Sequence, residues 1–125
     1  TPGRFGRGDV LCYPGEGDYI YALRGGNSRN FYRYSISQNR WEALTPFPED
    51  PVYDWRNIVY GTDLTYADGY LYALKGYNTP YFYRYSIESN SWEQLTSLPV
   101  NVGEGGSLCY PGTGDYIYAL IGNNT

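Results

Sequence analysis

The sequence predicts an all-β protein built from repeated units, and three observations support this prediction. The 125 residues include 17 tyrosines and 16 glycines, and tyrosine at this density suits strands, because its ring is apolar and its hydroxyl tolerates water. Short apolar runs alternate with Gly- and Pro-containing clusters, which favour turns. The stretch 17–44 recurs at 69–95, so that Tyr19, Tyr34 and Trp41 each have a counterpart 51 residues further on.

A third, partial copy begins at Cys109. Its sequence CYPGTGDYIYAL nearly duplicates CYPGEGDYIYAL from Cys12, and the chain ends at Thr125 after half a unit. Periods near 50 residues are typical of stacked repeats or propeller blades. We therefore treat residues 1–125 as a single segment, with one unit at 9–48, a linker at 49–62, a second unit at 63–99 and a half unit at 106–125.

Each full unit is predicted to contain four short antiparallel strands. In the first unit the strands are expected at 9–13, 18–23, 30–36 and 40–44, with turns at 14–17, 25–27 and 37–39. The second unit repeats this order from residue 63 with a tighter first turn at 67–69, and two further strands follow within 108–121. Both faces of the strand 18–23 are apolar, so we expect each sheet to be packed between neighbouring sheets.

Composition narrows the possible functions. A net charge of −4 with few lysines argues against a nucleic-acid partner, and no apolar run approaches the ~18 residues of a membrane helix. No signal peptide is visible, and a start at Thr1 suits a mature or excised piece. The chain has no histidine, so zinc and copper lose their usual ligand and a Ser-His-Asp triad is impossible. We expect no enzyme activity, cofactor or metal.

Repeated polar residues have structural explanations. Asp18 and Asp115 occupy equivalent positions beside turns, where a structural role is more probable than paired-carboxylate catalysis. Cys12 and Cys109 are also equivalent, and we expect buried free thiols, with an intermolecular disulfide as the open alternative.

The spacing of a glycine turn, a tyrosine and a tryptophan resembles the kelch repeat. The pattern is Arg24-Gly25-Gly26, Tyr34 and Trp41 in the first unit, and Lys75-Gly76-Tyr77, Tyr85 and Trp92 in the second. The second copy departs at Tyr77, where another glycine is expected, and the third keeps only Ile121-Gly122-Asn123. The resemblance implies kelch-type β-propeller blades of four antiparallel strands. The amino-acid sequence of the repeats also resembles repeat arrays in microbial secreted or surface proteins. This resemblance implies an extracellular or cell-surface setting.

Ten predicted strands amount to two and a half blades, which cannot close a ring of the usual four to eight blades. The last blade would expose an unpaired edge that can pair with another chain. We expect the ring to be completed either by other copies, as a homo-oligomer, or by the remainder of a longer parent chain. Two copies would contribute the twenty strands of five blades.

The candidate residues fall into two groups. Tyr34, Tyr85, Trp41 and Trp92 are predicted to pack between blades, with Gly25, Gly26 and Gly76 at turns. The repeated Arg33 and Arg84 are expected to stack on tyrosines or pair with carboxylates rather than bind ligand.

Loop residues between the second and third strands, together with the long linker, should gather on one face and bind protein or glycan. They are Asn27, Arg29, Tyr53, Trp55, Arg56, Tyr77 and Asn78. Trp55 has an equally good structural interpretation, in which it holds its linker down. The alternative function is that of a purely structural surface or filament-forming repeat protein, or of a designed or truncated propeller fragment.

Overall fold

The computed structural model describes residues 9–25, 28–49, 62–76, 78–103 and 106–122. These residues form ten strands and no helix. The strands are β1 (Val10–Cys12), β2 (Tyr19–Leu23), β3 (Phe31–Ser35), β4 (Arg40–Ala43), β5 (Asp63–Ala67), β6 (Tyr70–Leu74), β7 (Phe82–Ser86), β8 (Ser91–Gln94), β9 (Ser107–Cys109) and β10 (Tyr118–Leu120).

The strands form three antiparallel sheets, one for each sequence unit. The first has the order β1-β2-β3-β4, the second β5-β6-β7-β8, and the third contains only β9 and β10. The register repeats between units, since Tyr19 pairs with Ser35 in the first sheet and Tyr70 with Ser86 in the second. The all-β prediction is therefore confirmed, with propeller-type blades of four antiparallel strands and an incomplete last blade. The strands are slightly shorter than expected at several ends.

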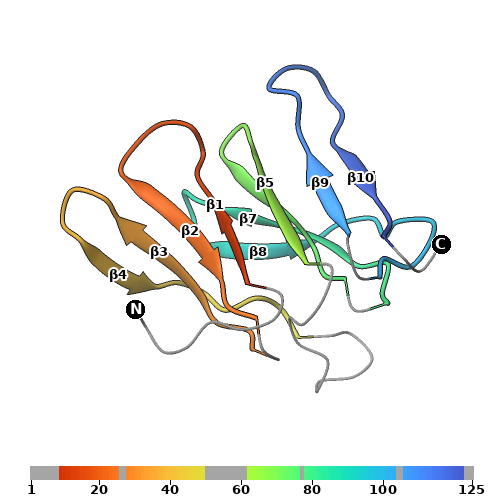
Figure 1. Ribbon diagram of the computed structural model, residues 1–125, viewed down its shortest axis with the longest axis horizontal. Coiled ribbons are helices and arrows are strands. Elements are labelled where there is room, and N and C mark those ends of the chain that lie inside the picture. The colour runs from red at the N-terminus through yellow and green to blue at the C-terminus, as the bar shows by residue number, and fades with distance from the viewer. Residues whose placement is uncertain (1–8, 26–27, 50–61, 77, 104–105, 123–125) are drawn as a thin grey trace.

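The three sheets are arranged around their first strands. β5 contacts both β1 and β9, and the three hairpins that begin with these strands have their turns at the same end of the molecule (Figure 1). The β5–β6 turn has only two residues, Asp68 and Gly69, with φ angles of 50° and 88°. Two successive positive φ values match the twist of a tight hairpin, which explains the Asp-Gly sequence at this turn.

The core between the first two sheets is mainly aromatic. Phe31 of the first sheet lies 4.7 Å from the ring of Tyr85 and 5.0 Å from that of Trp92, edge to face. Phe47, which follows β4, lies 4.9 Å from both Tyr83 and Trp92. Edge-to-face pairs of this kind stabilise a core beyond the area they bury. Trp92 and Tyr85 thus pack between blades, as predicted.

Hydrogen bonds join the outer parts of the same two sheets. The indole N–H of Trp92 donates to the Thr45 carbonyl at 2.9 Å, and the Thr45 N–H donates to Asn90 Oδ1 at 3.1 Å. Tyr85 also donates its hydroxyl to Asn90 Oδ1, at 2.6 Å. Burial raises the pKa of Tyr85 to about 12, so the hydroxyl stays protonated as a donor. Asn90 has a φ of 52°, a conformation that asparagine tolerates better than most residues.

The second interface is smaller. Leu74, Val102 and Leu108 form its buried centre, with Phe82 and Ile117 packed against it. The outer face of the two-stranded sheet is uncovered, and Tyr116, Tyr118 and Leu120 are 73%, 60% and 70% exposed.

Within the described residues, the first unit has one face that no other sheet covers. Trp41 lies against Tyr34, with ring centroids 5.1 Å apart, and Tyr34 donates its hydroxyl to Asn39. Both side chains lie on the face equivalent to the one that Trp92 presents to the first sheet. Within the described residues no other sheet covers that face, and for Tyr34 and Trp41 the packing between blades stays a prediction.

The cysteine expectation is partly wrong. Both thiols are free, as expected, but Cys109 is exposed and Cys12 is half-buried. The equivalent Cys12 lies beside Asp63 and Tyr66 of β5, the first strand of the next unit, and β9 has no such neighbour on that side among the described residues.

The two equivalent tryptophans provide a matched test of this packing. Replacing Trp92→Ala removes the contacts with Phe31 and Phe47 and should lower the free energy of unfolding by about 3 kcal/mol. Trp41→Ala leaves that interface intact, because Trp41 contacts Tyr34 and Tyr32 of its own sheet, and it should cost less than Trp92→Ala. Urea denaturation followed by circular dichroism measures both values. Equal losses would contradict the assigned interface.

Candidate functional site

The turns of the molecule form two sets at opposite ends of the strands. The β1–β2, β5–β6 and β9–β10 turns lie at one end (Figure 1). The β2–β3 and β6–β7 connections lie at the other end, because successive strands are antiparallel. Of the binding residues predicted from the sequence, the described ones, Arg29 and Asn78, belong to this second end.

Five of the predicted loop residues lie outside the described ranges. They are Asn27, Tyr53, Trp55, Arg56 and Tyr77, and the turn residue Gly26 also lies outside these ranges. For these positions the binding surface remains a prediction.

The remaining two predicted loop residues differ in role. Arg29 donates from Nε to the Phe47 carbonyl at 2.7 Å, and its Nη1 lies 3.4 Å from Glu49 Oε1. Arg29 therefore fixes the chain where it leaves β4. Asn78 is exposed, has a φ of 61°, and donates its backbone N–H to the Val102 carbonyl at 2.8 Å.

The two turn glycines also differ. Gly25 is buried and donates its N–H to Asp9 Oδ1 at 2.6 Å. Gly76 has a φ of 71°, where a side chain would be strained. Both serve the turn role predicted for them.

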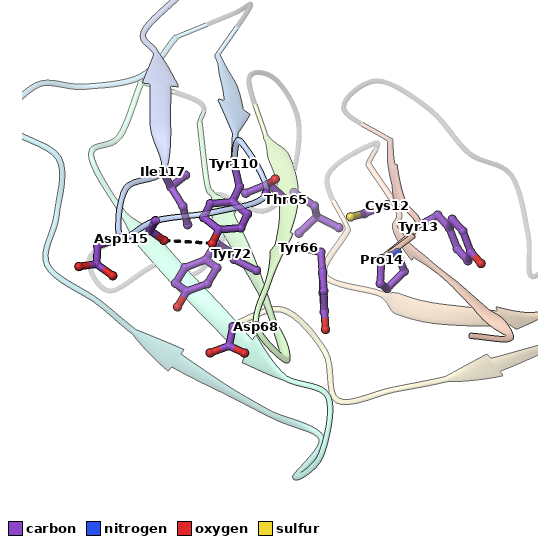
Figure 2. A pocket seen from close by; sticks show the side chains of 14 residues that line it. Cys12, Tyr13, Pro14, Thr65, Tyr66, Asp68, Tyr72, Tyr110, Asp115 and Ile117 are labelled. Atoms are coloured by element: carbon purple, nitrogen blue, oxygen red, sulfur yellow. Dashed lines mark hydrogen bonds between the residues drawn. The ribbon is translucent and has the colours of Figure 1, made fainter. Parts of the chain in front are cut away.

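A hollow lies at the opposite end, among the three hairpin turns. It is a cavity of about 740 Å³ that takes residues from all three units. Figure 2 shows its tyrosine rings with Asp68 and Asp115. The lining residues are Cys12, Tyr13, Pro14, Leu64, Thr65, Tyr66, Ala67, Asp68, Tyr72, Tyr110, Gly112, Gly114, Asp115 and Ile117.

Three of its tyrosines are held by the turns that follow them in the sequence. Tyr13 donates its hydroxyl to the Gly17 carbonyl at 3.1 Å, and Tyr110 donates to the Gly114 carbonyl at 3.0 Å. In the middle unit the direction reverses, and the Tyr66 hydroxyl accepts the Gly69 N–H at 3.1 Å. These are equivalent positions in the three repeats. Rings fixed in this way lose little freedom when they contact a ligand.

The glycines of the longer turns permit this arrangement. Gly15 and Gly112 both have a φ of 97°, and Gly17 and Gly114 have values of 86° and 89°. Residues with a Cβ rarely adopt these angles. The repeated Tyr-Pro-Gly-x-Gly sequence therefore encodes both the turn and the position of its tyrosine.

The polar groups of the cavity are acidic or neutral. Asp68 and Asp115 contribute carboxylates, and tyrosine hydroxyls can donate and accept hydrogen bonds. Burial, with a further contribution from Asp63, raises the pKa of the Cys12 thiol, so the thiol stays protonated and is a poor nucleophile at neutral pH. The lining contains no cationic side chain, and the cavity therefore disfavours anionic ligands.

Asp18 and Asp115 share a sequence position but not an environment. The Asp18 carboxylate accepts hydrogen bonds from Ser35 Oγ at 2.5 Å, from the Ser37 N–H at 2.8 Å and from Ser37 Oγ at 3.0 Å. These bonds, chiefly the one from Ser35, lower the pKa of Asp18. The predicted turn role is thus observed for Asp18. Asp115 faces the hollow region beside β10, where the chain supplies no matching serines.

Arg33 and Arg84 have structural roles, as expected. The Arg33 guanidinium lies 3.9 Å from the centre of the Tyr19 ring and 2.9 Å from Glu42. Arg84 repeats this arrangement, 4.1 Å from the Tyr70 ring and 3.1 Å from Glu93. Each arginine joins an aromatic ring of its own sheet to a carboxylate on the neighbouring strand.

The described ranges contain no cluster of three or more His, Cys, Asp or Glu residues able to hold a metal ion. In the same ranges no helix has the length and apolarity to cross a membrane.

The four-stranded sheets and their shared cavity define a segment of a β-propeller-type fold. No protein-family model matches the sequence, and no curated protein matches it. Among solved structures the chain is similar to one described as "Structure of YjhT", with a TM-score of 0.69 and 21% sequence identity. The match covers 90% of this chain and 33% of that one. At this identity the likeness shows the fold alone, and our chain spans about a third of that structure.

The environment of Asp18 predicts a dependence of stability on pH. Folding lowers the pKa of Asp18 below its ordinary value of 3.8. The contribution of Asp18 to the free energy of unfolding is therefore present above pH 3.8, and it is lost as the pH falls through the lowered pKa of the folded state. Asp18→Asn should therefore reduce the free energy of unfolding at pH 7, with the difference shrinking below pH 3.8. Asp115→Asn is the matched control and should change little. Urea denaturation across this pH range measures both, and a constant Asp18→Asn difference would contradict the assignment.

Proposed function

We propose that the chain is a non-catalytic, kelch-type β-propeller segment that binds neutral glycans in the cavity among its hairpin turns. The observation that supports this proposal is a set of equivalent tyrosines, one from each repeat, around one cavity. Each tyrosine is hydrogen-bonded to its own turn. The kelch assignment is supported by the repeated glycine, tyrosine and tryptophan positions, and by the packing of Trp92 and Tyr85.

The size and chemistry of the cavity favour a sugar. Its volume of about 740 Å³ lies within the range of ~300–1,000 Å³ usual for small-molecule sites. A sugar ring has apolar C–H faces that suit the flat rings of Tyr66 and Tyr110. Its hydroxyl groups can donate to Asp68 and Asp115, and the same carboxylates repel uronic acids and phosphates.

The non-catalytic part of the proposal rests on residue chemistry. The chain has no histidine to transfer protons near neutral pH. Asp68 and Asp115 belong to turns of different repeats, and the Cys12 thiol stays protonated. An extracellular or cell-surface setting, proposed from the sequence resemblance, is one in which glycans are abundant. A protein ligand on the loop end, around Trp55, is the other form of this binding proposal.

A second candidate function is assembly. The uncovered side chains Tyr116, Tyr118 and Leu120 form an apolar surface on the last sheet, and Leu11 is 65% exposed on the first. Exposed apolar surface of this extent is typical of interaction sites. The chain would then complete its ring with other copies, as a homo-oligomer, or with the remainder of a longer chain.

The glycan proposal is tested with defined oligosaccharides. Cellotetraose and maltotetraose are the neutral probes, and tetragalacturonate is the acidic one, with binding followed by NMR shift perturbation and calorimetry. At least one neutral probe should saturate, with shifts concentrated on the hairpin turns, and the acidic probe should not bind.

Substitutions then locate the site. Tyr66→Ala removes a ring from the cavity and should weaken binding by about tenfold, whereas Tyr66→Phe should weaken it less. Tyr32→Ala, which removes a ring from the open face of the first sheet, is the control and should leave affinity unchanged. If neither neutral probe binds, or if Tyr66→Ala and Tyr32→Ala have equal effects, the glycan proposal is wrong.

A further inference from the structure

We infer that the groove beside β10 is the docking site for an outer β-hairpin of the chain's own repeat type. The hairpin would carry Tyr-x-Tyr on its first strand and Asn-x-Trp on its second, as β3–β4 and β7–β8 do. This deepens the assembly role proposed above by naming the partner, and it does not depend on glycan binding.

The groove is a hollow of about 430 Å³ between the second sheet and the last one. Its walls include Phe82, Thr96 and Leu98 from the second unit, and Tyr116 and Ile117 from the third. The equivalent positions in the first unit are Phe31, Thr45 and Phe47. There, the corresponding space is filled by Tyr83, Tyr85 and Trp92 of the next unit's outer hairpin.

The backbone edge of β10 supports the same occupant. Its counterpart β2 pairs with β3 along five residues, from Tyr19↔Ser35 to Leu23↔Phe31, and β6 pairs with β7 in the same register. Within the described ranges β10 pairs only with β9. An edge of this kind can accept an added strand through main-chain hydrogen bonds, while adjacent hollows select its side chains.

Three side-chain positions match the expected hairpin. Asp115 is equivalent to Asp18, whose carboxylate binds Ser35 and Ser37 just beyond β3. Tyr116 is equivalent to Tyr19, which carries the Arg33 guanidinium on its ring. Thr96 is equivalent to Thr45, whose backbone contacts both Asn90 and Trp92.

A second folded copy fits this groove less well than a separate hairpin. The two hairpins of this type in the chain are already paired along their inner edges, β3 with β2 and β7 with β6. A folded copy would have to open one of its own sheets to donate either one. The partner is therefore an unpaired outer hairpin contributed by a further repeat.

The test uses a synthetic peptide with the sequence of residues 28–45, SRNFYRYSISQNRWEALT, added to the intact chain. It should bind with a ratio of one to one and slow hydrogen exchange at the amides of Tyr118–Leu120. A peptide with alanine in place of its second Tyr and its Trp should bind at least about tenfold more weakly. In the chain, Leu98→Glu should reduce affinity by a similar factor, while Leu11→Glu, on the open face of the first unit, should not.

Because an isolated hairpin is marginally stable, a second measurement joins the copied segment Arg29–Pro48 directly after Thr125. This join keeps the repeat register, and the extension should raise the melting temperature, whereas the version with the two alanines should not. The inference is overturned if the fusion gives no rise and the peptide gives no protection of β10. It is also overturned if β10 is protected in a self-associated chain without peptide, since a second copy is then the occupant. Absence of glycan binding affects neither readout.

Discussion

The structure depends on one constraint: a four-stranded sheet that is apolar on both faces must lie between two other sheets. The first and second units satisfy it toward each other, through the contacts of Phe31 and Phe47 with Trp92. The polar atoms at the rim are satisfied at the same time, because the indole N–H of Trp92 finds the Thr45 carbonyl. Hydrophobic burial supplies most of the stability of such an interface, and the hydrogen bonds fix its register.

Tyrosine carries three different roles in this chain, which explains its abundance. Tyr85 is buried between sheets with its hydroxyl bound to Asn90, Tyr66 supports a turn at the cavity, and Tyr19 supports the Arg33 guanidinium. Each role uses an apolar ring together with a polar tip or an electron-rich face. Phenylalanine could replace the first only with loss of the link to Asn90, and could not brace the turn. The repeat is thus specified by where each tyrosine hydroxyl finds its partner.

The sequence was sufficient to predict the fold, because alternating strands, Gly-rich turns and the 51-residue repeat are all local signals. It also predicted the roles of Trp92, Arg33 and Asp18. It did not reveal the cavity, which forms only where turns near residues 15, 68 and 112 meet in space. The signal that could have found it is the tyrosine placed directly before each turn, at positions 13, 66 and 110. The aromatic linker around Trp55 is the more conspicuous signal in the sequence. Composition shows where aromatic residues are concentrated, but it does not show which turns converge. The exposure of Cys109 was not predicted for a related reason, since the burial of the equivalent Cys12 depends on β5 of the next unit.

In this architecture the proposed glycan binding and the proposed assembly would be coupled. The cavity is bounded by the turns of successive first strands β1, β5 and β9, so each added unit would place another turn and another fixed tyrosine beside it. The groove next to β10 lies on the opposite side of Ile117 and Asp115, which line both hollows. A hairpin bound in that groove would donate hydrogen bonds to Asp115, as Ser35 and Ser37 do to Asp18. The Asp115 carboxylate would then be less available to a ligand in the cavity. The size and polarity of the binding site are therefore set by how many units surround it, and completing the last sheet would change the site as well as stabilise the fold.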